Sequence, residues 1–312
     1  LDLEAIAAGD MLKERKGTLH GFVAAGLAQE LLELAAWEIL GNTRESFMSG
    51  IVCHQDATCS GLQIAAAITG HRDTAIATNC TASTKTEVRQ DVYREVSDIC
   101  AATDTEIGEY CRTYGRNIVK YAVMVLGYGA GKATIIRTVG DYLKEQGVID
   151  CEAADWEMDE ASQEVLFGAL DEKCGATTGL MEQLQFIASR SAIRGEEELS
   201  WATADGFNVV QSQQAGELYE FGDFQLELDV EFSAEKQETA IAPNMVHSID
   251  ACQMRRAILA LPRKPVAAIH DSLGTRPAEY WEAAVAVRQA FVEACPRETV
   301  EAFMSKFDVE LK

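Results

Sequence analysis

Two aspartates follow short apolar segments of the chain, Asp56 after residues 51–55 and Asp271 after residues 266–269. Carboxylates are the hard oxygen ligands that Mg²⁺ prefers, and two such ions about 3.5–4 Å apart can activate a hydroxyl and stabilise a leaving phosphate. An aspartate behind a strand is more commonly a turn residue or a helix cap, so neither residue alone defines a site. Together they predict a metal site for phosphoryl or nucleotidyl transfer at the ends of adjacent strands.

A third chemical feature lies on a predicted helix over residues 116–126. Arg116, Lys120, Met124 and Tyr128 recur at intervals of four residues, which places them along one side of a helix. Cations on such a stripe suit a triphosphate, and a tyrosine at its end suits a nucleoside. Taken alone, the same pattern is typical of a surface helix with solvated cations.

The elements that would position these residues combine helical and strand-like patterns. Apolar spacing of three and four predicts helices over residues 19–40, 59–68, 86–101, 116–126, 181–192, 246–260 and 278–294. Short apolar or alternating runs predict strands over residues 50–55, 207–210, 224–232 and 266–269, the first and the last of them buried. With five prolines and no linker-like segment, the chain is predicted to form one interwoven α+β unit.

Composition narrows the class of protein. The chain has 312 residues, 47% of them hydrophobic, and a net charge of −23. Acidic residues concentrate in residues 141–173, where a solvated surface is expected, whereas basic residues cluster at 112–120 and 255–264. An acidic exterior can coexist with a basic lining, so the net charge does not exclude a nucleic-acid partner. Nine cysteines without a C-x-x-C pair indicate free thiols, and no apolar stretch predicts a transmembrane helix or a membrane partner.

Five stretches of the chain, in the same order, resemble the single-subunit DNA-directed RNA polymerases of phages and mitochondria. Residues 56–63 (DATCSGLQ) resemble motif A of that family, residues 116–129 resemble motif B with its Tyr-Gly pair, and residues 270–275 (HDSLGT) resemble motif C. Residues 201–206 and 236–248 resemble the family as well. Because the matches keep their order along the chain, they identify it as a member of that family.

The resemblance implies roles for motifs A and C. Asp56 and Asp271 would hold two Mg²⁺ ions, with the backbone carbonyl of Ala57 as a further ligand. Ala57 stands where the family usually has glycine, and a backbone carbonyl is retained in that exchange. His270 would support the end of the RNA primer beside the metal site.

The resemblance also implies the residues that bind the incoming nucleotide. Arg116 and Lys120 would bind its triphosphate. Tyr128, with Gly129 behind it, would pack at the sugar, where the family selects ribose over deoxyribose. His247 would lie nearby, against the sugar and the minor groove. Without the motifs, His247 would be taken for a partly buried histidine with ordinary partners.

The fold that the resemblance implies is a polymerase right hand of the α+β class, lacking the N-terminal domain and the thumb. Residues 1–75 would form an N-terminal helix and the first palm segment, residues 76–247 mostly helical fingers, and residues 248–312 the second palm segment. The chain would copy a DNA template into nascent RNA from ribonucleoside triphosphates. It would act in the cytoplasm of an infected bacterium or, alternatively, in an organelle.

A partner follows from the same resemblance. Residues 206–234 are shorter than the region of the family that contains its promoter-reading hairpin. A second polypeptide, or an N-terminal region missing from this sequence, would therefore recognise the promoter. Adaptation to high salt is a competing explanation for the acidic composition.

Three other functions fit parts of the pattern. A family A-like DNA polymerase would share the palm, although the Tyr-Gly pair and Asp271-Ser272 speak against it. An HD-type metal phosphohydrolase needs further metal-binding histidines, and the chain has only five histidines. A degenerate, non-catalytic nucleic-acid-binding subunit would not be expected to keep both aspartates.

Overall fold

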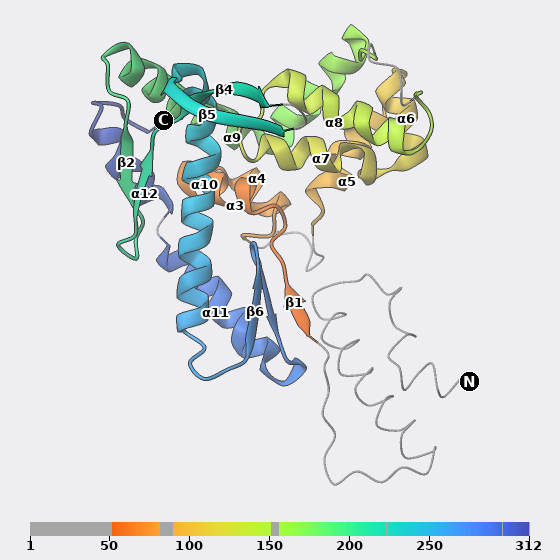
Figure 1. The fold of residues 1–312 in the computed structure, drawn as a ribbon. Coiled ribbons are helices and arrows are strands. Elements are labelled where there is room, and N and C mark those ends of the chain that lie inside the picture. Colours follow the sequence, from red (N-terminus) through yellow and green to blue (C-terminus); the bar gives the residue numbers. More distant parts are fainter. Residues whose placement is uncertain (1–51, 82–89, 151–155, 222–223, 295, 312) are drawn as a thin grey trace. The chain divides into compact units, whose positions relative to one another are not determined.

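The computed structural model describes residues 52–81, 90–150, 156–221, 224–294 and 296–311 (Figure 1). The predicted helix over residues 19–40 lies outside these described residues. The chain divides into two compact units, a smaller one of Leu1–Ala57 and Ala251–Ala294 and a larger one of Thr58–Asp250 and Cys295–Lys312. The prediction of a single unit is therefore wrong, although the segments of the two units do interleave along the sequence.

The smaller unit contains a three-stranded antiparallel sheet. Its strands are β1 (Cys53–Gln55), β6 (Val266–Ile269) and β7 (Ser272–Thr275), in the order β1-β7-β6. The helical elements of this unit are η1 (Pro277–Glu279), α11 (Tyr280–Glu293) and the last turns of α10 (Ala234–Leu259). Leu273 of β7 is fully buried in a cluster with Ala257 of α10 and Ala283 of α11, so both helices help to cover the sheet.

The central strand β7 was not predicted, and its presence changes two expectations. The strands that precede the two aspartates, β1 and β6, are not neighbours, because β7 lies between them. The prediction that residues 266–269 are buried is also wrong, since Ile269 is 56% exposed. A short apolar run predicts a strand but cannot tell a central strand from the edge strand that β6 is.

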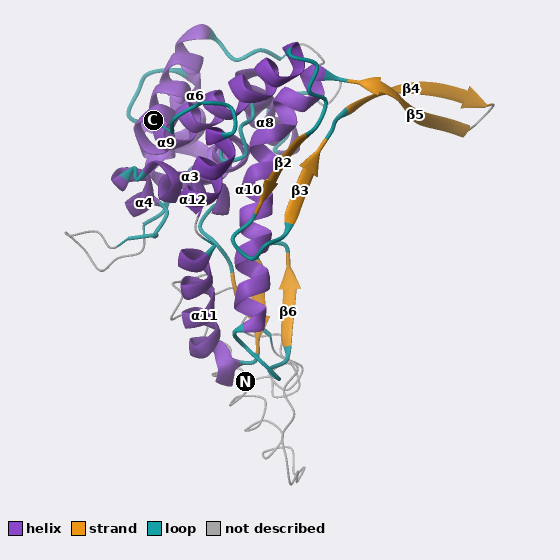
Figure 2. Ribbon diagram, turned by 90° about the vertical axis from the view of Figure 1, so that its left-hand side faces the viewer, coloured by secondary structure: helices purple, strands orange, loops and turns teal. Residues whose placement is uncertain are grey.

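The larger unit is mainly helical (Figure 2). Its helices are α3 (Ser60–Thr69), α4 (Arg72–Ala77), α5 (Val92–Ala101), α6 (Glu106–Tyr114), α7 (Arg116–Leu126), α8 (Lys132–Glu145), α9 (Glu160–Ile193), α12 (Pro296–Ser305) and the first part of α10. Two antiparallel hairpins complete it, β2 (Leu199–Ala202) with β3 (Asn208–Gln211) and β4 (Gln214–Phe221) with β5 (Phe224–Phe232). The mixed helical and strand content confirms the α+β class.

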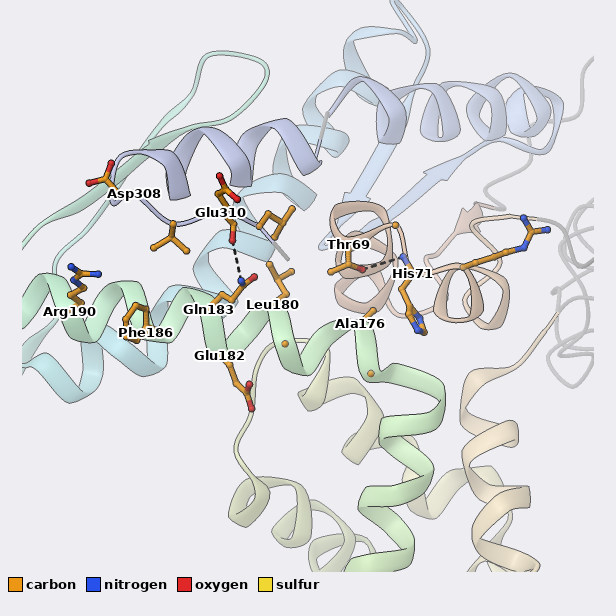
Figure 3. Close-up of a pocket in the computed structure, with 16 residues that line it drawn as sticks. Thr69, His71, Ala176, Leu180, Glu182, Gln183, Phe186, Arg190, Asp308 and Glu310 are labelled. Atoms are coloured by element: carbon orange, nitrogen blue, oxygen red, sulfur yellow. Dashed lines mark hydrogen bonds between the residues drawn. The ribbon is translucent and has the colours of Figure 1, made fainter.

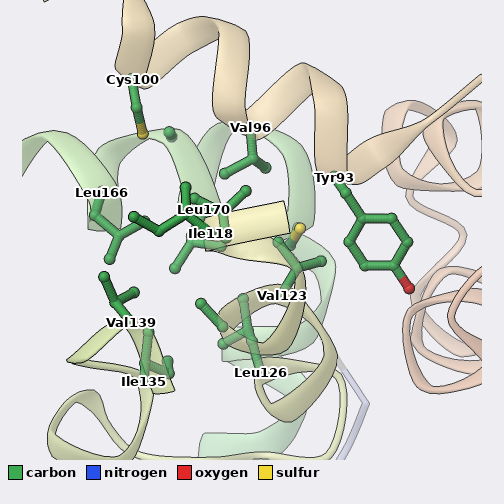
Figure 4. Packing of buried hydrophobic residues seen from close by; sticks show 14 of the residues in the cluster. Tyr93, Val96, Cys100, Ile118, Val123, Leu126, Ile135, Val139, Leu166 and Leu170 are labelled. Atoms are coloured by element: carbon green, nitrogen blue, oxygen red, sulfur yellow. The ribbon is translucent and has the colours of Figure 1, made fainter. Parts of the chain in front are cut away.

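The main core of the larger unit surrounds α7 (Figure 4). Ile118, Val119, Ala122, Val123 and Leu126 are buried, and this spacing puts them on one face of the helix. The apolar face therefore fixes the rotation of α7, which leaves the predicted cationic stripe on a less buried side.

Helix boundaries agree best where the apolar spacing is regular. The helices predicted over 59–68 and 116–126 are confirmed as α3 and α7. The helix predicted over 181–192 is only the end of the 34-residue α9, and α10 begins at Ala234 rather than at residue 246. Pro243 lies inside α10, and an interior proline argues against a helix in any sequence-based prediction. In the described parts of the chain, none of the helices has the length and hydropathy needed to cross a membrane.

Candidate active site

Asp56 and Asp271 lie at the same end of the three-stranded sheet, where β1 ends and β7 begins; we call this end of the strands the sheet edge. Gln55, the last residue of β1, pairs with Leu273 of β7, so Asp56 leaves β1 where β7 begins. Asp271 immediately precedes Ser272, the first residue of β7. Antiparallel pairing therefore brings the two aspartates to one edge, although β1 and β6 are not adjacent.

The turn between β6 and β7 fixes the position of Asp271. Ile269 pairs with Ser272, so the turn consists of His270 and Asp271. His270 has a φ of 53°, the left-handed conformation that two-residue hairpin turns demand. His270 is exposed and Asp271 is half-buried, which leaves both beside the open edge of the sheet.

Contacts that the sequence did not single out hold β1 in place. The side-chain amide of Gln55 donates to the carbonyl of Tyr280 at 2.7 Å, in a buried position. His54 Nδ1 lies 3.2 Å from Ser272 Oγ. A Cβ atom on Gly274, the partner of His54 across the strands, would come within 2.6 Å of Val52 Cγ1. Glycine at position 274 thus lets β1 pair closely with β7 and fixes the register that aligns the two aspartates.

The oxygen donors at this edge fit magnesium better than a transition metal. Within the described ranges, His, Cys, Asp and Glu side chains form no group of three or more that could hold a metal ion. Two carboxylates and the backbone carbonyl of Ala57 are hard oxygen donors, and Mg²⁺ is usually bound by one or two carboxylates together with substrate phosphates. The set does not resemble the histidine-rich site of an HD-type phosphohydrolase.

The predicted cationic stripe is present in the larger unit. Arg116, Lys120, Met124 and Tyr128 are all half-buried. Helix α7 ends at Leu126, and the chain continues in a turn in which the Tyr128 amide donates to the Val125 carbonyl at 3.1 Å. Tyr128 therefore lies in the turn just beyond the helix.

Arg116 has partners at the start of α5. Its guanidinium contacts Asp91 Oδ2 at 2.5 Å and lies 5.0 Å from the centre of the Tyr93 ring. Burial is the main reason that the pKa of Tyr93 is raised, so its ring stays neutral beneath the guanidinium. Lys120 makes a looser contact, with its ammonium 5.8 Å from the centre of the Tyr121 ring. A triphosphate would have to compete with Asp91 for Arg116.

The structure brings Tyr128 and His247 together. Their rings are stacked, with centroids 4.7 Å apart and planes inclined by 12°. The Tyr128 hydroxyl lies 3.1 Å from Ser60 Oγ, which in turn donates to Asp250 Oδ2 at 3.2 Å. Ser60 and Asp250 were not predicted as site residues. Ser60 lies in the stretch that resembles motif A, and Asp250 lies just beyond the family-like stretch of residues 236–248.

Helix α10 carries His247 and is anchored on both sides of it. The indole N–H of Trp201 donates to Ser248 Oγ at 2.9 Å. Gly129, next to Tyr128, has a φ of 81°, and a Cβ there would approach Ala242 of α10 at 3.0 Å. These contacts bring α10 close to the turn after α7, so that His247 faces Tyr128.

A separate groove of the larger unit contains none of the expected site residues (Figure 3). It has a volume of about 1030 Å³ and lies between the end of α3, the middle of α9 and residues 308–311. His71, Arg72 and Arg190 line it, but so do the acidic residues Glu182, Asp308 and Glu310. The mixed charges indicate no particular ligand.

The expected site residues fall into two sets. Asp56, Ala57, His270 and Asp271 belong to the smaller unit, and Arg116, Lys120, Tyr128, Gly129 and His247 belong to the larger one. Paired carboxylates on a sheet edge, and cations with a tyrosine on a helix, are the groups that a nucleotidyl-transfer enzyme needs. The class that these features fit best is a nucleotide polymerase.

Comparison with known proteins identifies the family. Residues 27–312 match the family model described as DNA-dependent RNA polymerase, and the chain belongs to that family. The family expected from the five stretches is therefore confirmed.

Individual relatives come from phages and plants. The DNA-directed RNA polymerase of Pseudomonas phage phiKMV is 28% identical over 294 residues, which cover 84% of this chain and 35% of the phage protein. The chloroplastic/mitochondrial DNA-directed RNA polymerase 2 of Arabidopsis thaliana is 29% identical over 288 residues, covering 85% of this chain and 28% of the plant protein. T7 RNA polymerase of Escherichia phage T7 is 38% identical over 108 residues, which cover 30% of this chain and 12% of that polymerase. The chain thus spans about a third of the length of the first two relatives.

Proposed function

We propose that this chain performs DNA-templated RNA synthesis and contains the palm and fingers of a polymerase right hand. The observation that supports the proposal most directly is the sheet edge that carries Asp56 and Asp271 in a chain that matches the RNA polymerase family. The palm would comprise the sheet of the smaller unit and the adjoining segments of residues 1–75 and 248–312. The fingers would occupy residues 76–247, with α7 as their working face.

The reaction would be attack of the RNA 3′ hydroxyl on the α-phosphate of a ribonucleoside triphosphate, with pyrophosphate as the leaving group. Asp56, Asp271 and the Ala57 carbonyl would hold two Mg²⁺ ions, which supply charge neutralisation and activate the hydroxyl. His270, at the turn beside Asp271, would support the primer end. Catalysis would come mostly from positioning and electrostatic stabilisation.

The larger unit would supply the nucleotide contacts. Arg116 and Lys120 would bind the triphosphate, whose charge draws Arg116 away from Asp91. Tyr128 would lie at the ribose, with Gly129 keeping the turn close to α10 and His247 covering the tyrosine ring. The stacked pair of Tyr128 and His247 supports this assignment, because it gives the sugar a surface of fixed geometry.

A primer-extension assay tests the proposal. The purified chain is given a preformed RNA–DNA scaffold, Mg²⁺ and either ribonucleoside or deoxyribonucleoside triphosphates. We expect template-directed addition of ribonucleotides. Preferential addition of deoxyribonucleotides would favour the DNA polymerase alternative, and scaffold binding without extension would favour the non-catalytic one.

Partners are part of the proposal as well. We propose that the DNA template and nascent RNA are bound together with a second polypeptide, or a further region of the same protein, that recognises the promoter. The acidic balance of the chain, with a net charge of −23, supports the need for a basic companion, since DNA binding requires several phosphate contacts. We further propose that it acts in the cytoplasm of an infected bacterium.

A further inference from the structure

We propose that Ser60 and Asp250 are positioning residues that fix the direction of the hydrogen bond made by the Tyr128 hydroxyl, so that its oxygen can only accept a hydrogen bond from the sugar. The inference rests on the proposed function, because it assigns the nucleotide sugar to Tyr128. It goes further by giving two residues of α3 and α10 a role in selecting the group at the 2′ position.

The direction follows from counting protons. A serine hydroxyl has one proton to donate, and an ionised carboxylate can only accept. Ser60 Oγ donates to Asp250 Oδ2 at 3.2 Å, and hydrogen bonds to a charged acceptor are stronger than those between neutral groups. The proton of Ser60 is therefore directed to Asp250. In the 3.1 Å contact between Ser60 Oγ and the Tyr128 hydroxyl, Tyr128 must then be the donor.

We call the two hydrogen bonds that run from Tyr128 through Ser60 to Asp250 the relay. Packing holds it in place. Ser60 is 3% exposed and begins α3, where a Cβ on the next residue, Gly61, would lie 2.4 Å from the carbonyl oxygen of Gly127. His247 of α10 stacks on the Tyr128 ring. The phenol is thus held beside Ser60, which accepts the proton of its hydroxyl.

The consequence is a preference for sugars that can donate. With its own proton given to Ser60, the Tyr128 oxygen can accept from a 2′-hydroxyl or a 2′-amino group. A 2′-fluoro group can only accept, and a 2′-hydrogen can do neither. The relay therefore predicts discrimination by hydrogen-bond direction, which the size of the 2′ group would not produce.

The test compares nucleotides that carry 2′-amino and 2′-fluoro groups, using the full chain. The ratio of their dissociation constants is measured by calorimetry, and the ratio of their kcat/KM values by primer extension on a scaffold. We expect the wild type to favour 2′-amino over 2′-fluoro. Asp250→Asn preserves the shape of the site but provides an amide that can donate to Ser60, which frees the relay to reverse. The preference should then fall by about two- to tenfold, the effect of one hydrogen bond.

Further variants separate the relay from a structural role. Ser60→Ala should reduce the preference as Asp250→Asn does, and Tyr128→Phe should remove it. Combining Tyr128→Phe with Ser60→Ala should cause no further change, because the two residues act through one interaction. Ser305→Ala, which removes an exposed hydroxyl bonded only locally to Ala302, is the control and should leave the ratio unchanged.

The outcomes are distinct for the two proposals. An unchanged ratio of dissociation constants in Asp250→Asn and Ser60→Ala, or a wild type that favours 2′-fluoro, would overturn the relay. If the wild type binds the 2′-amino nucleotide better, both variants lose this preference, and the wild type does not extend the primer, the relay is supported and the polymerase function is refuted. A wild type that binds neither nucleotide would overturn both.

Discussion

A Cβ atom on Gly61 would lie 2.4 Å from the carbonyl oxygen of Gly127, closer than any side chain can approach backbone. Gly61 lies in the first turn of α3, and Gly127 caps the end of α7. The contact therefore joins the stretch that resembles motif A to the one that resembles motif B. It also sets Ser60, which precedes Gly61, beside Tyr128, which follows Gly127.

Gly61→Ala should destabilise the larger unit, because the added methyl group meets backbone that cannot rotate away. Overpacking of this kind costs about 1–3 kcal/mol. Gly168→Ala is the matched control: it lies within α9, and a Cβ there meets nothing within 4 Å. Alanine at position 168 should raise stability by about 0.5–1 kcal/mol. Thermal and urea unfolding measure both, and equal stability of the two variants would contradict the close contact.

Asp56→Asn and Asp271→Asn should each abolish primer extension while the protein remains folded. Removing one carboxylate charge lowers the affinity of the site for Mg²⁺ without changing its shape. Asp308→Asn, at an exposed position of the larger unit, is the control for the loss of charge. Extension is measured over a range of Mg²⁺ concentrations, and circular dichroism checks the fold. Near-normal extension by either aspartate variant would refute the assignment of the metal site.

Asp91→Asn should lower the KM for ribonucleoside triphosphates with little change in kcat. Asp91 pairs with Arg116 and would compete with a triphosphate bound there as proposed; a partly exposed ion pair is worth up to about 1 kcal/mol, or roughly fivefold in affinity. Asparagine can still cap α5 as Asp91 does. Glu301→Gln, which breaks the exposed pair with Arg297, is the control. A raised KM would instead mean that Asp91 holds Arg116 in its binding position.

Gln237→Leu should be strongly destabilising, because Gln237 connects α10 to the hairpin of β2 and β3. Its side-chain oxygen accepts from the Gln213 amide at 3.0 Å, and its side-chain nitrogen donates to the Gln211 carbonyl at 3.1 Å. The side chains of Gln237 and Gln211 are buried, so leucine at position 237 leaves polar groups unsatisfied, at about 1–3 kcal/mol each. Urea unfolding measures the loss. Thr239→Ala, at an exposed position of the same helix, should change stability far less.

The chain by itself should not start transcription at a duplex promoter at moderate salt. Duplex DNA carries one negative charge per about 1.7 Å, and the chain carries a net charge of −23. Adding a basic companion polypeptide should restore initiation. If the acidic surface instead reflects adaptation to high salt, initiation by the isolated chain should increase as salt is raised. Efficient promoter-specific initiation without a second protein at ordinary salt would exclude the partner.

The sequence predicted the elements whose burial pattern is regular and the residues that resemble known motifs. Helix α7 was predicted with its observed bounds because its apolar face is uninterrupted. Strand β7 was missed, since its four residues, Ser272–Thr275, include glycine and two hydroxyl side chains and no alternation of apolar residues. Strand pairing reveals it: β7 pairs with β6 across the two-residue turn and with β1 more than two hundred positions away.

The candidate site shows the same division. Tyr128 and His247 could be expected to lie together from the resemblance, and their rings do stack. Ser60 and Asp250 could not be connected with Tyr128, because a hydrogen bond between residues far apart in the chain leaves no pattern in a single sequence. The helix that carries His247 was predicted from residue 246, but Pro243 hid its first part, which begins at Ala234.

The two-residue turn at His270 and Asp271 leaves no slack between β6 and β7. One extra residue on either side would shift the strand pairing by one position and turn every following side chain to the opposite face of the sheet. Apart from His270, Asp271 and Gly274, the positions of residues 266–275 should therefore tolerate exchanges of amino acid far better than changes of length. In a library of single-codon insertions scored for survival of function, this short stretch should appear as a gap.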